Sequence, residues 1–196
     1  MTLRLAALSL VLLAGGCATL PAPAPGDDWP ARRAALQALD AWALDGRIAV
    51  AAGDDGYSGG FDWRQQGARA DIALTGPMGA AAMDIRAEGE RAVVSIGGES
   101  YEGEEARSLF SKYFGPDQQL PIVQMRYWLV GAPAPGLPHE ETLGADRRLA
   151  ALSQSGWQVR YDRYEPVGGL ALPARMEMTA PGLRLRVVVS DWRLAP

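Results

Sequence analysis

The side chains best suited to catalysis are scarce in this chain. Its 196 residues include one histidine, His139, and one cysteine, Cys17. General acid–base catalysis needs a titratable side chain held beside the reacting atom, whereas His139 lies in the Pro-rich polar stretch GAPAPGLPHEE, which is typical of a surface loop. No serine is expected at a nucleophile elbow, where a strand turns sharply into a helix. We therefore expect no catalytic residues and no enzymatic activity.

The same scarcity argues against a metal or cofactor site. Transition-metal ions are bound by groups of His and Cys side chains, and this chain has one of each. Asp54 and Asp55 could contact a calcium ion, but between Gly53 and Gly56 a solvated hairpin turn is the simpler interpretation. With 19 basic and 23 acidic side chains, the composition also lacks a nucleic-acid signature. We expect no metal, no cofactor and no nucleic-acid partner.

Cys17 stands at the end of a segment typical of an export signal. Arg4 precedes the apolar run Leu5–Leu13, which is too short to span a bilayer, and the small residues Ala14-Gly15-Gly16 follow. This order resembles the lipobox of bacterial lipoproteins, in which the cysteine is lipidated and becomes the new N-terminus. Ala14 is a departure, because the usual pattern has Leu at that position.

These features predict three segments. Residues 1–16 form a signal peptide, residues 17–28 hold the lipidated Cys17 and a flexible Pro/Ala-rich tether, and residues 29–196 form one domain. Ala18, rather than Asp, follows the cysteine, which resembles the outer-membrane address of enteric lipoproteins. We expect an outer-membrane, lipid-anchored protein that faces the periplasm.

Period-two alternation of apolar residues covers most of the domain and predicts strands with one buried face. The predicted strands are Trp42–Ala52, Tyr57–Gln65, Arg69–Thr75, Ala81–Ala87, Arg91–Ile96, Glu99–Glu102, Arg148–Gln154 and the segments around Trp157–Asp162, Arg175–Met178 and Leu183–Ser190. Helical spacing predicts a leading helix from Pro30 to about Asp40 and two central helices, one over Ala106–Phe114 and one from Pro121 to Leu129.

This order of elements predicts a mainly β fold with α-helices, of class α+β. Short turns and one-sided alternation indicate an antiparallel sheet, and about eleven strands would curl. We expect an incomplete (half) barrel whose open side is covered by helices, with an apolar cavity between them.

Alternation and helix position select the residues expected to line this cavity. Several are methionines, whose flexible side chains suit ligands of varying shape. The candidates are Trp63, Ile72, Leu74, Met83, Ile85, Val94, Ile96, Met125, Leu129, Trp157, Val159, Met176, Met178, Leu185 and Val187. Ordinary core packing remains an alternative for each, and a bulge would change which residues face the interior.

An ordered set of segments resembles the LolB family of outer-membrane lipoproteins. These segments are WALDGRIAV, GGFDWRQQG, LTGPMGAAAMDI, LPIVQMRYWLVGAPAP, SQSGWQVRYDRY, LPARMEM and LRLRVVVSDW. The resemblance implies an eleven-stranded half-barrel shared with the soluble carrier LolA, which holds acyl chains of lipoproteins. It implies a protein that accepts lipoproteins from a LolA-like carrier and inserts them into the inner leaflet of the outer membrane, working as a monomer.

Met78 is an apolar residue between Gly76-Pro77 and Gly79, where a turn normally faces water. The family carries an exposed apolar residue, usually Leu, on a loop between two early strands, and the resemblance assigns membrane insertion to Met78. Two other interpretations remain open: a lipid-binding envelope lipoprotein with different cargo, and a structural lipoprotein that scaffolds an envelope complex.

Overall fold

A computed structural model describes residues 28–53, 55–76, 81–89, 91–114 and 120–195. Eleven strands form a single antiparallel sheet in the order β6-β5-β4-β3-β2-β1-β11-β10-β9-β8-β7. The predicted α+β class and the open eleven-stranded sheet are confirmed. The predicted lipidation site Cys17 and the predicted membrane contact Met78 both lie outside the described residues.

The sheet consists of two meanders joined by their longest strands. The N-terminal half contains β1 (Ala41–Ala52), β2 (Asp55–Gln66), β3 (Arg69–Thr75), β4 (Ala81–Glu88), β5 (Arg91–Ile96) and β6 (Glu99–Glu102). The C-terminal half contains β7 (His139–Leu143), β8 (Leu149–Gln154), β9 (Trp157–Val167), β10 (Leu170–Ala180) and β11 (Leu183–Leu194). The first and last strands, β1 and β11, pair along their length and so connect the two halves.

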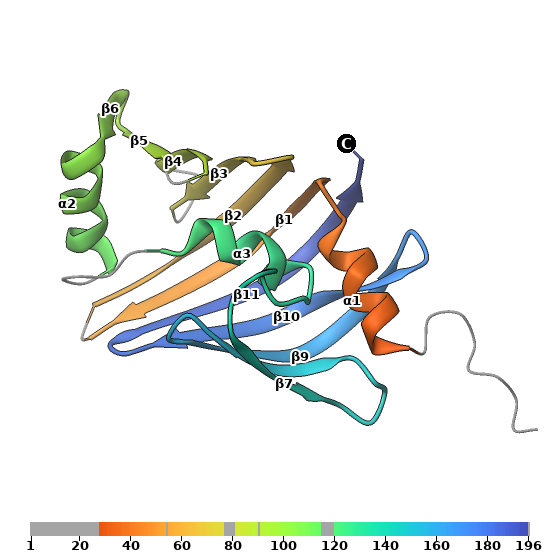
Figure 1. Ribbon diagram of the computed structural model, residues 1–196. Coiled ribbons are helices and arrows are strands. Elements are labelled where there is room, and N and C mark those ends of the chain that lie inside the picture. The colour runs from red at the N-terminus through yellow and green to blue at the C-terminus, as the bar shows by residue number, and fades with distance from the viewer. Residues whose placement is uncertain (1–27, 54, 77–80, 90, 115–119, 196) are drawn as a thin grey trace, which may run out of the picture.

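Three helices accompany the sheet (Figure 1). They are α1 (Trp29–Gln37), α2 (Gly103–Phe114) and α3 (Ile122–Leu129). Figure 1 shows α1 and α3 on the same face of the sheet, whereas α2 follows β6 at the edge of the N-terminal half. Pro30 occupies the first turn of α1, where a missing N–H is tolerated. None of the described helices is both long and apolar enough to cross a membrane.

A bulge in β11 sets which side chains face the helices. Asp45 pairs with Asp191 and Gly46 with Val189, so Ser190 has no partner on β1. The extra residue shifts the alternation by one, and both Val189 and Trp192 are therefore buried. Gly46 is required at this point, because a Cβ there would lie 2.3 Å from the carbonyl oxygen of Val188.

Two predictions about local structure need correction. The segment GAPAPGLPHEE was expected to be entirely loop, but His139–Leu143 forms the edge strand β7, which pairs with β8 on one side only. Its exposed polar residues give no apolar alternation to detect. The leading helix also ends at Gln37, earlier than the predicted Asp40.

Candidate functional site

The apolar face of the sheet and α3, which we call the lid helix, enclose a small apolar pocket. Its volume is about 20 Å³, close to the space that one water molecule occupies. It is lined by Ile48, Phe61, Trp63, Ile72, Leu74, Ile85, Leu120, Ile122, Met125 and Leu185. All strand residues in this group come from β1–β4 and β11, so the pocket lies under the N-terminal half.

The predicted cavity residues all belong to one continuous apolar core or pack against it. Those that line the pocket are Trp63, Ile72, Leu74, Ile85, Met125 and Leu185. Those buried elsewhere in this core are Met83, Val94, Leu129, Trp157, Val159, Met176, Met178 and Val187, and Ile96 packs against it while partly exposed. The alternation therefore identified the apolar face, and contact of these residues with a ligand stays a prediction.

Four lining residues were absent from the predicted set: Ile48, Phe61, Leu120 and Ile122. A usable signal existed for three of them. Ile122 lies on the helical stripe that also includes Met125. Ile48 has the same parity as Leu44 in β1, and Phe61 the same parity as Trp63 in β2. Leu120 precedes Pro121, outside any periodic segment, so only the fold brings it to the pocket.

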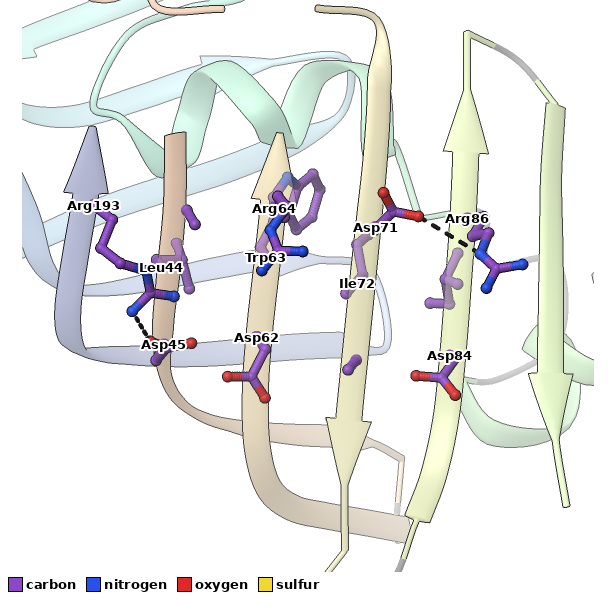
Figure 2. Close-up of a pocket in the computed structure, with 13 residues that line it drawn as sticks. Leu44, Asp45, Asp62, Trp63, Arg64, Asp71, Ile72, Asp84, Arg86 and Arg193 are labelled. Atoms are coloured by element: carbon purple, nitrogen blue, oxygen red, sulfur yellow. Dashed lines mark hydrogen bonds and ion pairs between the residues drawn. The ribbon is translucent and has the colours of Figure 1, made fainter. Parts of the chain in front are cut away.

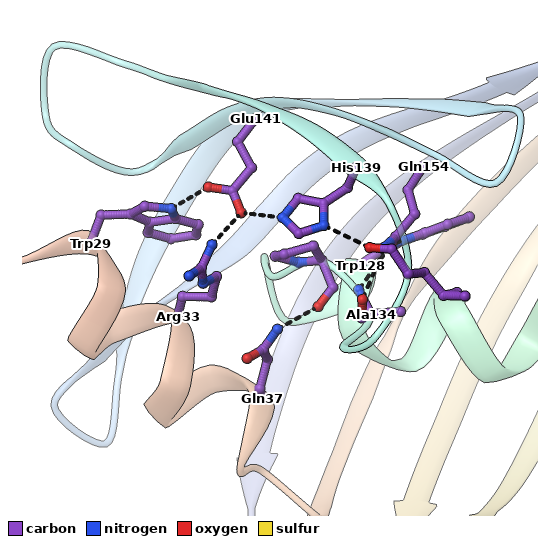
Figure 3. A network of polar contacts seen from close by, with 10 residues as sticks. Trp29, Arg33, Gln37, Trp128, Ala134, His139, Glu141 and Gln154 are labelled. Carbon is purple, nitrogen blue, oxygen red and sulfur yellow. Dashed lines mark hydrogen bonds and ion pairs between the residues drawn. The ribbon is translucent and has the colours of Figure 1, made fainter.

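Buried hydrogen bonds fasten the lid helix to the C-terminal half (Figure 3). The Gln154 side-chain oxygen on β8 accepts hydrogen bonds from Trp128 Nε1 and from the Ala134 backbone N–H, both at 2.8 Å. Its amide nitrogen donates to the Ala134 carbonyl oxygen at 2.9 Å. The Tyr161 hydroxyl on β9 donates to the Trp128 carbonyl oxygen at 2.9 Å. Gln154 is 2% exposed, so these bonds are shielded from water.

A second polar network attaches α1 to the edge strand β7 (Figure 3). The Glu141 carboxylate accepts hydrogen bonds from Trp29 Nε1 and from Arg33, the latter at 2.9 Å. Burial opposes the charged form of Glu141, but these donors outweigh it and hold the pKa of the carboxyl below its usual value. Gln37 of α1 also donates to the Pro133 carbonyl oxygen at 2.9 Å. The helix that follows the tether therefore contacts both β7 and the loop after the lid helix.

The lid helix meets the N-terminal half differently. Its apolar residues, with Met125 3% exposed, cover the pocket. Here Arg126 donates a hydrogen bond to the Gly67 carbonyl oxygen at 2.7 Å, and this bond is exposed to solvent. Val123, in the first turn of the helix, is 43% exposed. This side of the lid helix is held mainly by apolar contacts that have no directional preference.

The opposite face of the sheet carries a charged groove of about 330 Å³ (Figure 2). Asp45 on β1 pairs with Arg193, which holds the pKa of Asp45 below its ordinary value. Partial burial, together with the neighbouring charge of Asp45, raises the pKa of Asp62. Figure 2 shows Asp62 on β2 and Asp84 on β4, with strand β3 between them. The groove is thus a separate polar surface of β1–β4 and β11.

The described residues offer little for catalysis. His139 contacts Glu141 and the Leu137 carbonyl oxygen, both at 2.9 Å, and serves the α1–β7 network. The spacing Gly-x-Ser-x-Gly does occur at Gly56–Gly60, but Ser58 lies within β2, paired with Ala49, and not at a strand-to-helix turn. Within the described ranges, no three His, Cys, Asp or Glu side chains gather as a metal site.

Solved structures with this architecture define the class of fold. A LolA superfamily protein from Nitrosomonas europaea superposes with a TM-score of 0.52 at 15% identity, covering 84% of this chain and 92% of that one. A DUF1329 family protein from Desulfovibrio piger superposes with a TM-score of 0.59 at 10% identity, covering 86% and 91%. The chain therefore shares with these two proteins the fold of an open antiparallel sheet that has helices over its apolar face.

Sequence relatives identify the branch within that class. The family model described as outer membrane lipoprotein LolB matches residues 40–192. Proteins named outer-membrane lipoprotein LolB are 36% identical in Nitrosococcus oceani, over 95% of this chain and 94% of the relative, and 36% identical in Pseudomonas aeruginosa, over 97% and 95%. The chain belongs to the LolB family, and the resemblance first read from its sequence segments is confirmed.

Proposed function

We propose that this protein is an outer-membrane receptor that accepts lipoproteins from a LolA-like carrier and delivers them to the inner leaflet of the outer membrane. The observation that carries the proposal is the apolar surface between the sheet and the lid helix, in a chain of the LolB family. Acyl chains are the part of the cargo that this surface would cover. The process makes or breaks no covalent bond, so the protein is proposed to be a transport factor and not an enzyme.

The physical need for such a surface is large. Exposing an acyl chain to water costs roughly 0.8 kcal/mol per CH₂ group, so acylated cargo has to remain covered until it reaches a bilayer. A receptor must bind the chains more tightly than the carrier does and less favourably than the membrane. The surface is lined mainly by Ile and Leu side chains, and Met125 adds a flexible side chain that can adjust its contacts to the cargo.

The pocket has to enlarge before it can hold a chain. At about 20 Å³ it has room for little more than one water molecule. The lid helix is fastened by buried hydrogen bonds to β8 and β9 but contacts β1–β4 through apolar side chains and one exposed hydrogen bond. We therefore propose that the lid helix moves away from the N-terminal half and pivots on the C-terminal half.

Membrane attachment is assigned to Cys17. Lipidation there, followed by the tether of residues 17–28, would hold the domain at the periplasmic face of the outer membrane. The tether leads directly to α1, whose contacts with Glu141 and Pro133 fix the point at which it enters the domain. Each domain contains its own complete apolar surface, which supports action as a monomer.

The proposal is tested by a transfer reaction. A LolA-like carrier loaded with a labelled lipoprotein is mixed with the chain of residues 17–196 carrying Cys17→Ala, and the label is followed by size exclusion. We expect the label to move to the receptor. Label that stays on the carrier would rule the receptor function out. Mass spectrometry of the purified protein then separates lipoprotein acyl chains from other bound lipids.

Met78 is proposed to contact the membrane during delivery. Burying one Met side chain in the bilayer interface contributes roughly 1.5–3 kcal/mol at most, which is too little for anchoring but enough to orient the domain. We expect Met78→Glu to fold and accept cargo normally while failing to insert it into liposomes. Met78→Leu is the matched control and should retain insertion. A large loss of stability in Met78→Glu would instead identify Met78 as a core residue.

A further inference from the structure

The outer face of the C-terminal half, opposite the lid helix, carries rows of arginines. The strand register aligns Arg47 of β1 with Val188 of β11, Arg175 of β10 and Arg163 of β9. The adjacent row places Arg186 of β11 and Arg160 of β9 on either side of Glu177. Side chains alternate across a strand, so these residues face away from the buried Met176 and Val187.

We call this surface the arginine patch. It consists of Arg47, Arg160, Arg163, Arg175, Arg184 and Arg186, all of which are exposed. The acidic residues among them are Asp162 and Glu177, which leave a local excess of four positive charges. The whole chain has a net charge of −4, so this excess runs against the overall charge of the protein.

The cations of the arginine patch are only partly neutralised. Glu177 pairs with Arg186 at 2.8 Å and with Arg160 at 3.4 Å. For Arg47, Arg163, Arg175 and Arg184, the described part of the chain provides no ion-pair partner. Arg163 and Arg175 even lie opposite one another across β9 and β10, an arrangement of like charges that is unfavourable unless an anion lies nearby.

An apolar side chain lies at the centre of the arginine patch. Val188 is 38% exposed, between Arg47 and Arg175 in the strand register. Figure 1 shows both α1 and α3 on the other face of the sheet, so neither helix covers Val188. Arginines surrounding an exposed aliphatic residue form a surface suited to the boundary between phosphate head groups and acyl chains.

We propose that the arginine patch binds the anionic head groups of a lipid bilayer. The row over four adjacent strands extends about 15 Å, far more than a single phosphate can span, so it would contact several head groups at once. The proposal rests on the proposed function in one respect, since the lipidated tether supplies the bilayer. The new proposal specifies which face of the domain contacts this bilayer, and that the positive charge of this face selects anionic lipids.

The bilayer fits these observations better than an acidic protein surface does. Residues 17–28, which are proposed to tie the domain to a membrane, would make the effective concentration of head groups around it high. Guanidinium groups bind phosphate through paired N–H groups, and the long arginine side chains adapt to a mobile surface. An acidic region of the carrier is the competing partner, and the experiment below tests for it.

Vesicle binding provides the test. The chain of residues 17–196 with Cys17→Ala is sedimented with vesicles of phosphatidylcholine, with and without phosphatidylglycerol. The test variant is Arg163→Gln with Arg175→Gln. The matched control is Arg91→Gln with Arg107→Gln, which removes the same charge from exposed positions of the N-terminal half. Thermal unfolding checks that both variants fold, and the transfer reaction is run on each in parallel.

We expect binding that requires phosphatidylglycerol and weakens with added salt. Each arginine near a charged membrane contributes about a fivefold gain in affinity, so the test variant should bind about 25-fold more weakly while the control binds normally. Equal losses in both variants, or no loss in the test variant, would overturn the proposal. Normal vesicle binding with impaired transfer would also overturn it and assign the patch to the carrier. If transfer fails for every form, including the one without arginine substitutions, the proposed function is wrong but the vesicle result still stands.

Discussion

The two halves of the sheet hold the same lid helix in different ways. In the C-terminal half, Gln154 and Tyr161 bind the end of the helix and the loop after it through buried hydrogen bonds. In the N-terminal half, the contacts between described residues are apolar, apart from the exposed bond between Arg126 and the Gly67 carbonyl oxygen. A buried hydrogen bond has one good geometry, whereas apolar contacts can be exchanged for others at little cost.

The two kinds of contact meet two requirements of the proposed function, one at each end of the lid helix. One end of the lid helix needs a fixed position, so that the protein keeps a single fold when it is empty. In the proposed function, the other end needs neighbours that acyl chains can replace. Buried polar groups at the first end and apolar ones at the second satisfy both requirements within one short helix.

The largest effect is expected at the fixed end. Gln154→Leu leaves Trp128 Nε1 and both backbone groups of Ala134 buried without their partner. At about 1–3 kcal/mol for each orphaned group, and with partial relaxation, we expect the free energy of unfolding to fall by about 3–5 kcal/mol in urea titrations. The control is Gln158→Leu on β9, an exposed position that should change it by less than about 0.5 kcal/mol. If Gln154→Leu and Gln158→Leu lower the free energy of unfolding equally, the buried hydrogen bonds of Gln154 do not fix this end of the lid helix.

Truncating one methionine at each half of the sheet compares how well the two halves tolerate a lost side chain. Met125 belongs to the lid helix and lines the pocket against the N-terminal half, and Met176 is fully buried on β10. Truncation of a buried Met to Ala costs about 2–5 kcal/mol, depending on how well the site collapses. We expect Met176→Ala at the upper end of this range and Met125→Ala near the lower end, because the lid helix can settle toward β1–β4. Thermal or urea unfolding measures both, and the reverse order would contradict an adaptable N-terminal half.

Arg126 offers a smaller and more selective change. Arg126→Gln removes the charged donor to the Gly67 carbonyl oxygen, and we expect a loss of about 0.5–1 kcal/mol because the bond is exposed. Amide hydrogens of the lid helix should then exchange about 2–5 times faster, with no change in β8 and β9. Arg107→Gln on α2 serves as control. Faster exchange throughout the sheet would mean that the bond supports the whole fold and not the lid helix alone.

The smallest change in the free energy of unfolding is expected for a substitution at Asp62, on the outer face of the N-terminal half. The pKa of Asp62 is raised, so its charged form is less favourable in the folded protein than in the unfolded chain. Asp62→Asn should therefore increase the free energy of unfolding at neutral pH, by no more than about 0.5 kcal/mol. The gain should vanish as the pH falls below the usual aspartate range, where both states are protonated. Asp84→Asn, which removes a charge from the same face, is the matched control.

Apolar periodicity was enough to predict most of the sheet and its buried face. Strand Arg69–Thr75 has its predicted bounds because its side chains alternate cleanly between buried and more exposed positions. Strand Arg91–Ile96 also has its predicted bounds, although its burial pattern is less regular. Strand β7 was missed because a polar edge strand has no apolar stripe. The sequence also gave no sign that Gln154 would bind the loop at Ala134, since that contact depends on how distant segments meet. Cys17 and Met78 stay predictions from the sequence and the family.

The pairing of β1 with β11 has a consequence for biogenesis. The register joins Trp42 to Leu194, so the middle of the sheet is completed by the last strand of the chain. During export the N-terminal half emerges first, and its apolar face lacks a neighbour on one side until β11 arrives. Closing so long a loop is slow compared with forming local hairpins. We therefore expect the half-formed sheet to be prone to aggregation, and periplasmic chaperones to matter most during this interval.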